Sequence, residues 1–311
     1  MKKNELYEVT IENINTNGEG IGHILLPESM KETNISPSRA GRQSMTVFVK
    51  DTVVADTVLA RITKVKSSYA YGRVEKLLKA SPYRVEPRCK TAKSCGGCTL
   101  MQMSYDQQLQ FKWNLVKNCL IRIGGIKDIE TCMEPICGMK KPYHFRNKMQ
   151  FPVGLNKDGT VQIGFYAAHT HSIVNLDKCE IGHPVNYDIL LALRDWLQKW
   201  QNQTGSFIYD EETHTGLVRH ILTRVGFSTG EVMVCLVLNG DGLGNPSCEY
   251  ELREVLHEAI DRYNGAQDFS GEGDREQVYV LTSVVLNTNR DKTNRILGDS
   301  CKVLYGSPYI T

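Results

Sequence analysis

The sequence predicts an α+β protein, with a small, OB-like antiparallel β-barrel at the N-terminus and a larger α+β domain with a mostly antiparallel sheet behind it. Two observations predict this class. Over residues 6–78, apolar and polar residues alternate in short runs that glycine-rich turns separate, which is the pattern of short strands. Beyond residue 79, segments with the 3.6-residue period of helices stand between pairs of strand segments.

Composition sets the broad class. The chain has 311 residues, of which 41% are hydrophobic and 23% charged, as is usual for a globular protein with room for two domains. No uninterrupted apolar run reaches the ~18 residues of a membrane span, and the first residues lack the apolar core of a signal peptide. We therefore expect a cytoplasmic protein, without a membrane partner, that is a monomer.

The last two strand segments of the barrel, DTVLARITKV and YAYGRVEKLL, carry a mixture of cations and aromatic rings. The cations Lys64, Lys66 and Arg73 interleave with Tyr69 and Tyr71. Cations can pair with phosphates while aromatic rings stack on bases, so these five residues are candidate RNA-binding residues. An ordinary solvated strand surface is the alternative.

Charge is unevenly distributed along the chain. Residues 51–148 hold 18 Lys and Arg against 8 Asp and Glu, whereas residues 151–311 hold 13 against 21. A basic first half is typical of a protein that binds a polyanion, because each neutralised phosphate releases counterions. A solvated basic face would give the same composition.

The proline-containing stretch SPYRVEPRC marks a change of pattern and a domain boundary. We therefore expect a barrel domain over residues 1–78, a central domain over residues 79–305, and the start of a linker over residues 306–311. Within the central domain, strand segments alternate with helical segments over residues 186–203 and 249–263.

The segment SYDQQLQFKWNLVKNCLIRIGG predicts a helix over residues 104–124. Ser104 and Gln107 have the spacing of a capping box, and Gly124 and Gly125 would end the helix. Its apolar residues fall on one face that must be covered, namely Leu109, Trp113, Val116, Leu120 and Ile123.

Three of the ten cysteines are close together in the stretch RCKTAKSCGGC, as Cys89, Cys95 and Cys98. Clustered cysteines in the cytosol are more typical of metal sites than of disulfides. The two glycines between the second and third cysteine allow the backbone to fold back and leave N–H groups for hydrogen bonds to sulfur.

A four-thiolate site needs one more ligand. Cys179 stands between a strand segment and a turn and fits this place, with Cys132 and Cys137 as its substitutes. Zinc and a [4Fe-4S] cluster both accept four thiolates. Only one C-x2-C pair is present, and nearby cations suit the negative charge of a cluster, which favours iron-sulfur and leaves zinc open.

The segments CKTAKSCGGCTLMQMSYDQQLQFK, YHFRNKMQF, IGFYAAHTHSIVNLDKCEIG and TGLVRHILTRVG follow the barrel in this order. This order resembles the RNA uracil-5-methyltransferase family, in particular the enzymes that form 5-methyluridine in 23S ribosomal RNA. The resemblance implies a TRAM domain over residues 1–78. It also implies a [4Fe-4S] cluster on Cys89, Cys95, Cys98 and Cys179, and RNA contacts from Tyr143, Arg146, Asn147 and Lys148.

The same resemblance implies S-adenosylmethionine as the methyl donor, bound by a Rossmann-like methyltransferase domain. We expect this domain to be missing, with the catalytic nucleophile and base beyond Thr311, and the helix over 104–124 to pack against it in the full-length enzyme. No catalytic residue is then expected in this chain, which would be inactive alone. The alternative is a non-enzymatic, zinc-stabilised RNA-binding protein.

Overall fold

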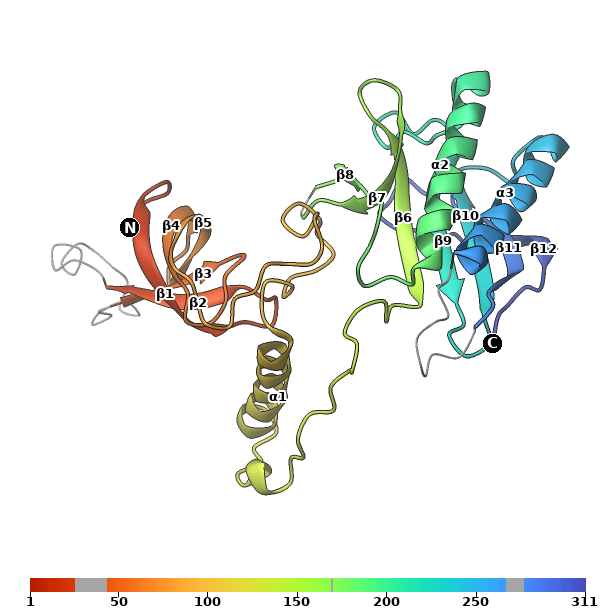
Figure 1. Cartoon of the computed structure of the whole chain (residues 1–311). Coiled ribbons are helices and arrows are strands. Elements are labelled where there is room, and N and C mark those ends of the chain that lie inside the picture. The colour runs from red at the N-terminus through yellow and green to blue at the C-terminus, as the bar shows by residue number, and fades with distance from the viewer. Residues whose placement is uncertain (26–43, 169, 267–276) are drawn as a thin grey trace. The chain divides into compact units, whose positions relative to one another are not determined.

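The computed structural model describes residues 1–25, 44–168, 170–266 and 277–311. It has two compact units, which are coloured along the chain in Figure 1. We name them the barrel unit, made of Met1–Lys93 and Cys98–Lys140, and the sheet unit, made of Ser94–Gly97 and Lys141–Thr311. The chain therefore passes from one unit to the other inside the cysteine motif. The domain bounds at residues 78 and 305 stay predictions.

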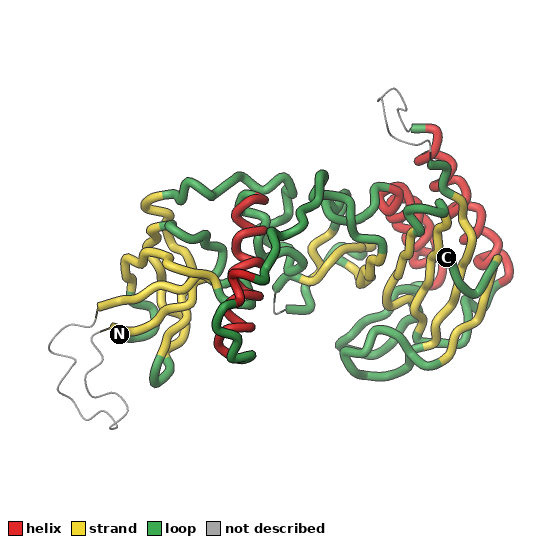
Figure 2. Tube along the Cα trace, turned by 90° about the horizontal axis from the view of Figure 1, so that it is seen from below, coloured by secondary structure: helices red, strands yellow, loops and turns green. Residues whose placement is uncertain are grey.

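Five strands of the barrel unit close into a barrel in the order β1-β2-β3-β5-β4 (Figures 1 and 2). Their bounds are β1 Leu6–Ile14, β2 Gly20–Leu25, β3 Ser44–Val49, β4 Thr57–Val65 and β5 Tyr69–Lys79. Alternate side chains point inward, and fully buried Ile11, Val47 and Ile62 belong to its core. A Cβ on Gly22 would collide with the Val9 side chain and the Thr10 carbonyl, so glycine allows β1 and β2 to approach closely.

The predicted fold class is wrong in describing this barrel as antiparallel. β3 pairs with β5 in parallel, with Phe48 opposite Tyr71, whereas the other pairs are antiparallel. Successive strands alternate in direction, and a ring with an odd number of them must bring two strands of the same direction together. One parallel pair is the geometric consequence of closing five strands.

Helix α1 (Tyr105–Arg122) confirms the predicted helix and belongs to the barrel unit. The predicted capping box is not formed, because the Ser104 side chain makes no cap hydrogen bond. The first turn is closed instead by the backbone N–H of Gln108, which donates to the Ser104 carbonyl at 2.9 Å.

The chain that follows the helix covers part of the apolar face predicted for α1, within the same unit, and leaves Val116 and Ile123 exposed. This return segment contains η3 (Ile129–Thr131). Trp113 Nε1 donates to the Glu134 carbonyl at 3.1 Å, and a Cβ on Gly138 would lie 2.8 Å from the Leu109 side chain. The face is only partly shielded, since no residue of α1 is fully buried.

The sheet unit holds seven strands in the order β12-β11-β10-β9-β6-β7-β8. Their bounds are β6 Lys148–Leu155, β7 Val161–Tyr166, β8 Ile173–Asn175, β9 Val218–Val225, β10 Glu231–Leu238, β11 Val280–Thr288 and β12 Ser300–Gly306. Among the described strands of this unit, β10 and β11 alone pair in parallel, and the crossover that joins them contains a helix, as a parallel pair requires a long connection.

Helices α2 (Val185–Thr204) and α3 (Pro246–Gly265) confirm the two other predicted helices and pack on one face of the sheet (Figure 1). Alternate residues of β10, such as Val234 and Leu236, face these helices, while Met233 and Cys235 belong to a small second cluster on the other face. None of the helices in the described residues is long and apolar enough to cross a lipid bilayer.

Candidate nucleic-acid interface and cysteine motif

Three aromatic rings gather on the outer surface of the barrel. Phe48 lies 5.6 Å from both Tyr69 and Tyr71 between ring centroids, and the two tyrosines are 5.5 Å apart. Their strand neighbours Val47 and Ala70 are fully buried, so alternation along β3 and β5 directs these three rings outward. We call Phe48, Tyr69 and Tyr71 the aromatic face.

The predicted cations lie beside the aromatic face. Lys64 stands opposite Tyr71 across the β4–β5 pair, and Arg73 follows Tyr71 on the same side of β5. Arg73 exposes 67% of its side chain, and the backbone N–H of Lys66 donates to the Tyr69 carbonyl at 2.8 Å. The structure thus brings together all five predicted residues, with Lys66 in the turn between β4 and β5.

The Tyr71 hydroxyl adds no negative charge to this surface. Partial burial, and then the neighbouring Tyr69, raises the pKa of Tyr71 above its usual range. The hydroxyl therefore stays protonated near neutral pH, and the ring can lie beside phosphates without repelling them.

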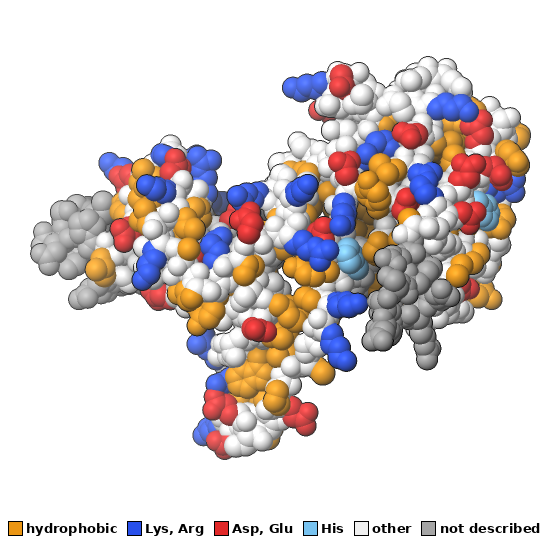
Figure 3. All heavy atoms as spheres, viewed as in Figure 1, with side chains coloured by type: hydrophobic (Ala, Val, Ile, Leu, Met, Phe, Trp, Pro, Cys, Tyr) orange, Lys and Arg blue, Asp and Glu red, His pale blue; other side chains and the backbone are white. Residues whose placement is uncertain are grey.

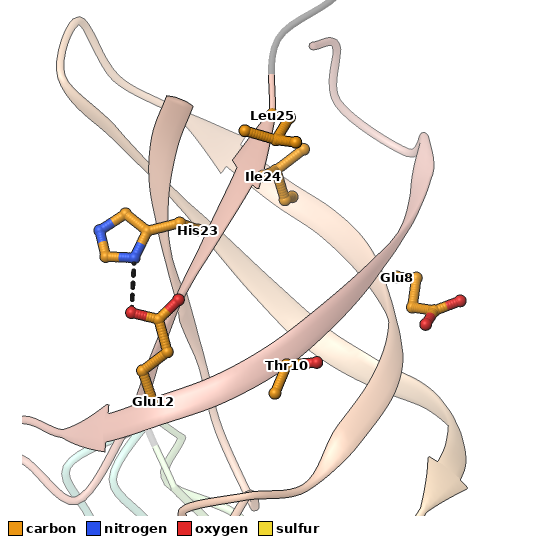
Figure 4. Close-up of a pocket in the computed structure, with 6 residues that line it drawn as sticks. All are labelled: Glu8, Thr10, Glu12, His23, Ile24 and Leu25. Atoms are coloured by element: carbon orange, nitrogen blue, oxygen red, sulfur yellow. Dashed lines mark hydrogen bonds and ion pairs between the residues drawn. The ribbon is translucent and has the colours of Figure 1, made fainter. Parts of the chain in front are cut away.

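The β1–β2 surface of the barrel has the opposite character. It has a hollow of about 400 Å³, in which His23 Nδ1 and Glu12 Oε2 are 3.0 Å apart. Figure 4 shows His23 and Glu12 pointing toward one another and Glu8 pointing away from this pair. Two carboxylates here would repel a nucleic acid, so the surface formed by β3, β4 and β5 is the better candidate for RNA.

The predicted RNA contacts Arg146, Asn147 and Lys148 lead into β6 of the sheet unit. The backbone holds them firmly, since Arg146 N–H donates to the Ile181 carbonyl at 2.8 Å and the Asn147 carbonyl accepts from Val225 N–H at 2.9 Å. Their side chains are exposed, whereas Tyr143 is half-buried. A fixed backbone with exposed polar side chains suits contacts to phosphate and sugar.

Sequence reasoning missed Arg224, which stands directly opposite Lys148 in the β6–β9 pair. Both side chains are exposed, and neither forms an ion pair with another described residue. Like charges opposite one another destabilise a sheet, so an anion between them would be favoured. Arg224 is the one exposed residue of β9, which the sequence alone could not distinguish from the buried Arg219, and the partner strand was not predictable either.

The four predicted cluster ligands are half-buried and divided between the units. In the barrel unit, Cys89 Sγ lies 3.3 Å from Thr91 Oγ1. In the sheet unit, Cys95 pairs with Ala167, its sulfur accepts from Gly97 N–H at 3.4 Å, and Cys179 packs on the core.

Gly96 holds the cysteine motif against β7. Its N–H donates to the Tyr166 carbonyl at 3.0 Å, and a Cβ on Gly96 would lie only 2.9 Å from that oxygen. Glycine is therefore required for this close approach.

Within the described residues, no three His, Cys, Asp or Glu side chains are grouped as a metal ion requires. The thiols and the N–H···S bond suit a thiolate-bound metal, but the described geometry does not assemble the site. Cys132 and Cys137 are exposed. Burial raises the pKa of Cys235 and of Cys248 to about 12, which keeps these thiols protonated and unsuited to metal binding.

A second polar group that the sequence did not indicate lies beside the cysteine motif in the sheet unit. Glu211 accepts from Tyr166 Oη at 2.8 Å and contacts His171 Nδ1 at 2.6 Å. Burial opposes ionisation of Glu211, but the hydrogen bonds from His171 and Tyr166 outweigh it and lower the pKa of this carboxyl. Glu211 lies in a loop 40 residues from His171, so no local pattern could have paired them.

Comparisons with known proteins agree with the barrel. Residues 2–74 match the family model of the TRAM domain. Over 310 residues, the chain is 36% identical to a Clostridium tetani protein named uncharacterized RNA methyltransferase, and 34% identical to one of the same description from Halalkalibacterium halodurans. These alignments cover 100% of this chain and 57% and 58% of those proteins, so the chain spans little more than half their length.

Among solved structures, the chain resembles the Pyrococcus abyssi tRNA (uracil-54, C5)-methyltransferase in complex with S-adenosyl-L-homocysteine. The TM-score is 0.59 at 21% identity, and the match covers 97% of this chain and 56% of that one. The predicted fold class is wrong in this respect too, because it defined the protein by a missing Rossmann-like domain. Nearly the whole chain aligns with about half of that structure, and no Rossmann-like domain is shown to be missing. Residues 2–74 match a TRAM domain, and the whole chain is similar to proteins named RNA methyltransferases.

Proposed function

We propose that this chain is the RNA-binding part of an S-adenosylmethionine-dependent RNA methyltransferase that forms 5-methyluridine in 23S ribosomal RNA. The names of its relatives support RNA methylation. The structural neighbour's title supports uracil C5 as the methylated atom and S-adenosylmethionine as the donor. Ribosomal RNA as the substrate is what the resemblance carried by the cysteine, YHFRNKMQF and TGLVRHILTRVG segments implies.

The observation that carries the proposal is the aromatic face of the barrel with its neighbouring cations. Bases of single-stranded RNA stack on exposed aromatic rings, and each stacked base contributes about 1–3 kcal/mol of binding free energy. Lys64, Lys66 and Arg73 would neutralise the backbone phosphates beside those bases. The exposed side chains of Arg146, Asn147 and Lys148, with half-buried Tyr143, would add contacts from the sheet unit.

Binding of labelled 23S ribosomal RNA fragments tests this interface. Tyr71→Ala should weaken binding by about fivefold or more, as expected for a lost base stack, while Tyr71→Phe keeps the ring and should bind as the wild type does. Tyr309→Ala, which removes an exposed ring of the sheet unit, is the matched control. Equal binding by Tyr71→Ala and the wild type would remove the aromatic face from the proposal.

Methyl transfer is tested separately, with labelled S-adenosylmethionine and either ribosomal or transfer RNA as acceptor. Mass spectrometry of the digested RNA locates the methyl group. We expect 5-methyluridine in 23S ribosomal RNA from the protein in its full natural length. Methylation of transfer RNA alone would reject the proposed substrate, and methylation at another atom would reject the proposed reaction.

We further propose that Cys89, Cys95, Cys98 and Cys179 hold a [4Fe-4S] cluster. The thiol donors, the three-residue spacing of Cys95 and Cys98, and the N–H···S bond from Gly97 support it. Such a cluster would supply structural support. The proposed chemistry of methyl transfer does not use it.

Iron, zinc and acid-labile sulfide analysis of anaerobically purified protein tests the cluster. We expect iron and sulfide in equal amounts, and a loss of both in Cys179→Ser but not in Cys301→Ser, which changes an exposed cysteine outside the motif. Zinc without sulfide would favour the zinc-stabilised alternative. An intact cluster in Cys179→Ser would reject this residue as a ligand.

A further inference from the structure

One exposed aromatic ring of the sheet unit stands in the turn between β9 and β10. Phe227 is 42% exposed, although it is a large apolar residue. Two backbone hydrogen bonds fix the turn, because Gly226 N–H donates to the Glu231 carbonyl at 2.8 Å and Gly230 N–H donates to the Gly226 carbonyl at 2.8 Å. The Phe227 ring is therefore presented to solvent from a fixed backbone.

Buried rings support Phe227 from one side. The ring centroids of Phe227 and His183 are 5.2 Å apart, with 36° between the ring planes. His183 is itself buried, its ring lies 4.6 Å from that of Tyr279, and its Nε2 lies 2.9 Å from Tyr279 Oη. A ring that is already held in this way loses little conformational freedom when a flat ligand stacks on its open side.

The same rings are joined to the segment of predicted RNA contacts that leads into β6. The backbone N–H of His183 donates to the Arg146 carbonyl at 3.3 Å. Val225, two residues before Phe227, donates its N–H to the Asn147 carbonyl at 2.9 Å. Phe227 therefore stands where the β6–β9 pair ends, close to residues proposed to contact RNA.

Cations accompany the ring. Arg224 precedes Phe227 by three residues and stands opposite Lys148 in the β6–β9 pair. The side chains of Arg146, Lys148 and Arg224 are exposed, and none of them forms an ion pair with another described residue. Positive charge that no carboxylate neutralises favours an anionic ligand.

The ring and the cations together select the class of ligand. An unpaired RNA base offers a flat face for stacking, and the phosphates on either side of it offer negative charge. The surface over α2 and α3 is less suitable, because Asp195, Glu254 and Glu258 are exposed there and would repel phosphates. Figure 3, in the view of Figure 1, shows red carboxylate groups over these helices.

We propose that Phe227 stacks on one unpaired base of the bound RNA while Arg224 and Lys148 contact the phosphates beside that base. This inference rests on the proposed function and adds a stacking site in the sheet unit to the aromatic face of the barrel. It also selects the form of the substrate. The bases of a fully paired duplex stay stacked on one another, so the site takes single-stranded segments of RNA.

Titration of the whole chain with a labelled single-stranded fragment of 23S ribosomal RNA tests the stack. Phe227→Leu keeps an apolar side chain over His183 but removes the ring, so affinity should fall about fivefold or more, whereas Phe227→Tyr should bind as the wild type does. The matched control Tyr250→Leu removes an exposed ring of α3 and should not change the affinity. Circular dichroism of each variant establishes that it is folded.

Inorganic polyphosphate separates stacking from charge, because it carries phosphates without bases. Phe227→Leu should bind polyphosphate as the wild type does, whereas Arg224→Gln should weaken the binding of both polyphosphate and RNA. A 2-aminopurine base placed in the RNA fragment supplies a direct readout of stacking. Its fluorescence should be quenched by the wild type and much less by Phe227→Leu at saturating protein.

Equal RNA affinity of Phe227→Leu and the wild type would overturn the inference, and so would an equal loss of polyphosphate binding in that variant. If Tyr71→Ala still weakened RNA binding in either case, the proposed function would stand without this second stack. A paired duplex that loses as much affinity in Phe227→Leu as the single strand does would reject base stacking. Displacement of the RNA by a Glu-Leu-Ser peptide of equal charge would indicate a protein partner instead.

Discussion

Asp56 shows how one buried charge organises the barrel unit. Its carboxylate is fully buried and accepts from the backbone N–H groups of Val53 at 2.7 Å and Ser81 at 2.9 Å. Arg84 completes the set, with Nη2 at 2.5 Å from Oδ2. A buried carboxylate is stable only when such partners replace water, so Asp56 fastens the segment after β5 to the turn before β4.

Asp56→Ala should therefore lower the free energy of unfolding of the barrel unit by about 3 kcal/mol, because it leaves two N–H groups and a partly buried guanidinium without their acceptor. Urea unfolding followed by circular dichroism measures the loss. Glu8→Ala, which removes an exposed carboxylate of the same barrel, should change the value by less than about 0.5 kcal/mol. Equal effects of the two changes would contradict the role of burial.

Histidines buried in the neutral form predict a pH dependence for the sheet unit. Burial, and then His144, lowers the pKa of His183 from 6.5 to about 4, and its Nε2 lies 2.9 Å from Tyr279 Oη. Below pH 6.5 this histidine binds a proton in the unfolded chain but not in the folded chain. The folded state therefore loses stability as pH falls from 6.5 to 4.

Between pH 4 and 6.5, His183 alone should make the free energy of unfolding rise by about 1.4 kcal/mol per pH unit. Unfolding free energies measured across the window should show a slope that is smaller by this amount in His183→Gln. The same slope in both proteins would show that His183 titrates normally. His220, whose pKa burial also lowers to about 4, should account for a similar remaining slope.

At the scale of elements, local patterns were predictable and pairings were not. The apolar period and the two terminal glycines predicted α1 to within two residues of Tyr105–Arg122. The parallel neighbours β3 and β5 are separated by β4 in the sequence, and nothing local signals that they meet. The five cations and rings of β4 and β5 could be proposed together because antiparallel neighbours in sequence pair often, whereas Arg224 and Lys148 are 76 residues apart.

The β6–β9 pair makes a prediction that separates stability from RNA binding. Arg224→Glu places a carboxylate opposite Lys148 and should raise the unfolding free energy by about 0.2–1 kcal/mol, since a repulsive pair becomes an attractive one. RNA affinity should fall, because a phosphate then loses a cation and meets an anion.

Thermal unfolding and RNA titrations at several salt concentrations measure both effects. The neutral variant Arg224→Gln loses one phosphate contact, so the slope of log RNA affinity against log salt concentration should become shallower by about one. Lys157→Glu makes the same kind of charge change in the turn between β6 and β7 and should leave RNA affinity nearly unchanged. Unchanged RNA affinity in Arg224→Glu would remove this strand pair from the interface.

At the scale of the whole molecule, charge and packing divide the chain in different ways. The basic stretch over residues 51–148 runs through most of the barrel unit and ends as the sheet unit begins. Composition could therefore indicate which unit is the candidate for RNA binding. It could not indicate that Ser94–Gly97, inside the cysteine motif, belongs to the sheet unit, because that depends on contacts such as the one from Gly96 to Tyr166.

Each unit buries its own hydrophobic core, so calorimetry should resolve two cooperative transitions. Leu197 is a fully buried residue of α2. Leu197→Ala should lower the unfolding free energy of the sheet unit by about 2–5 kcal/mol, and its transition temperature by roughly 2–4 °C per kcal/mol. Asp56→Ala should lower only the transition temperature of the barrel unit. If either change shifted both transitions equally, the two cores would unfold as one, and the division of the chain into separately stable units would be wrong.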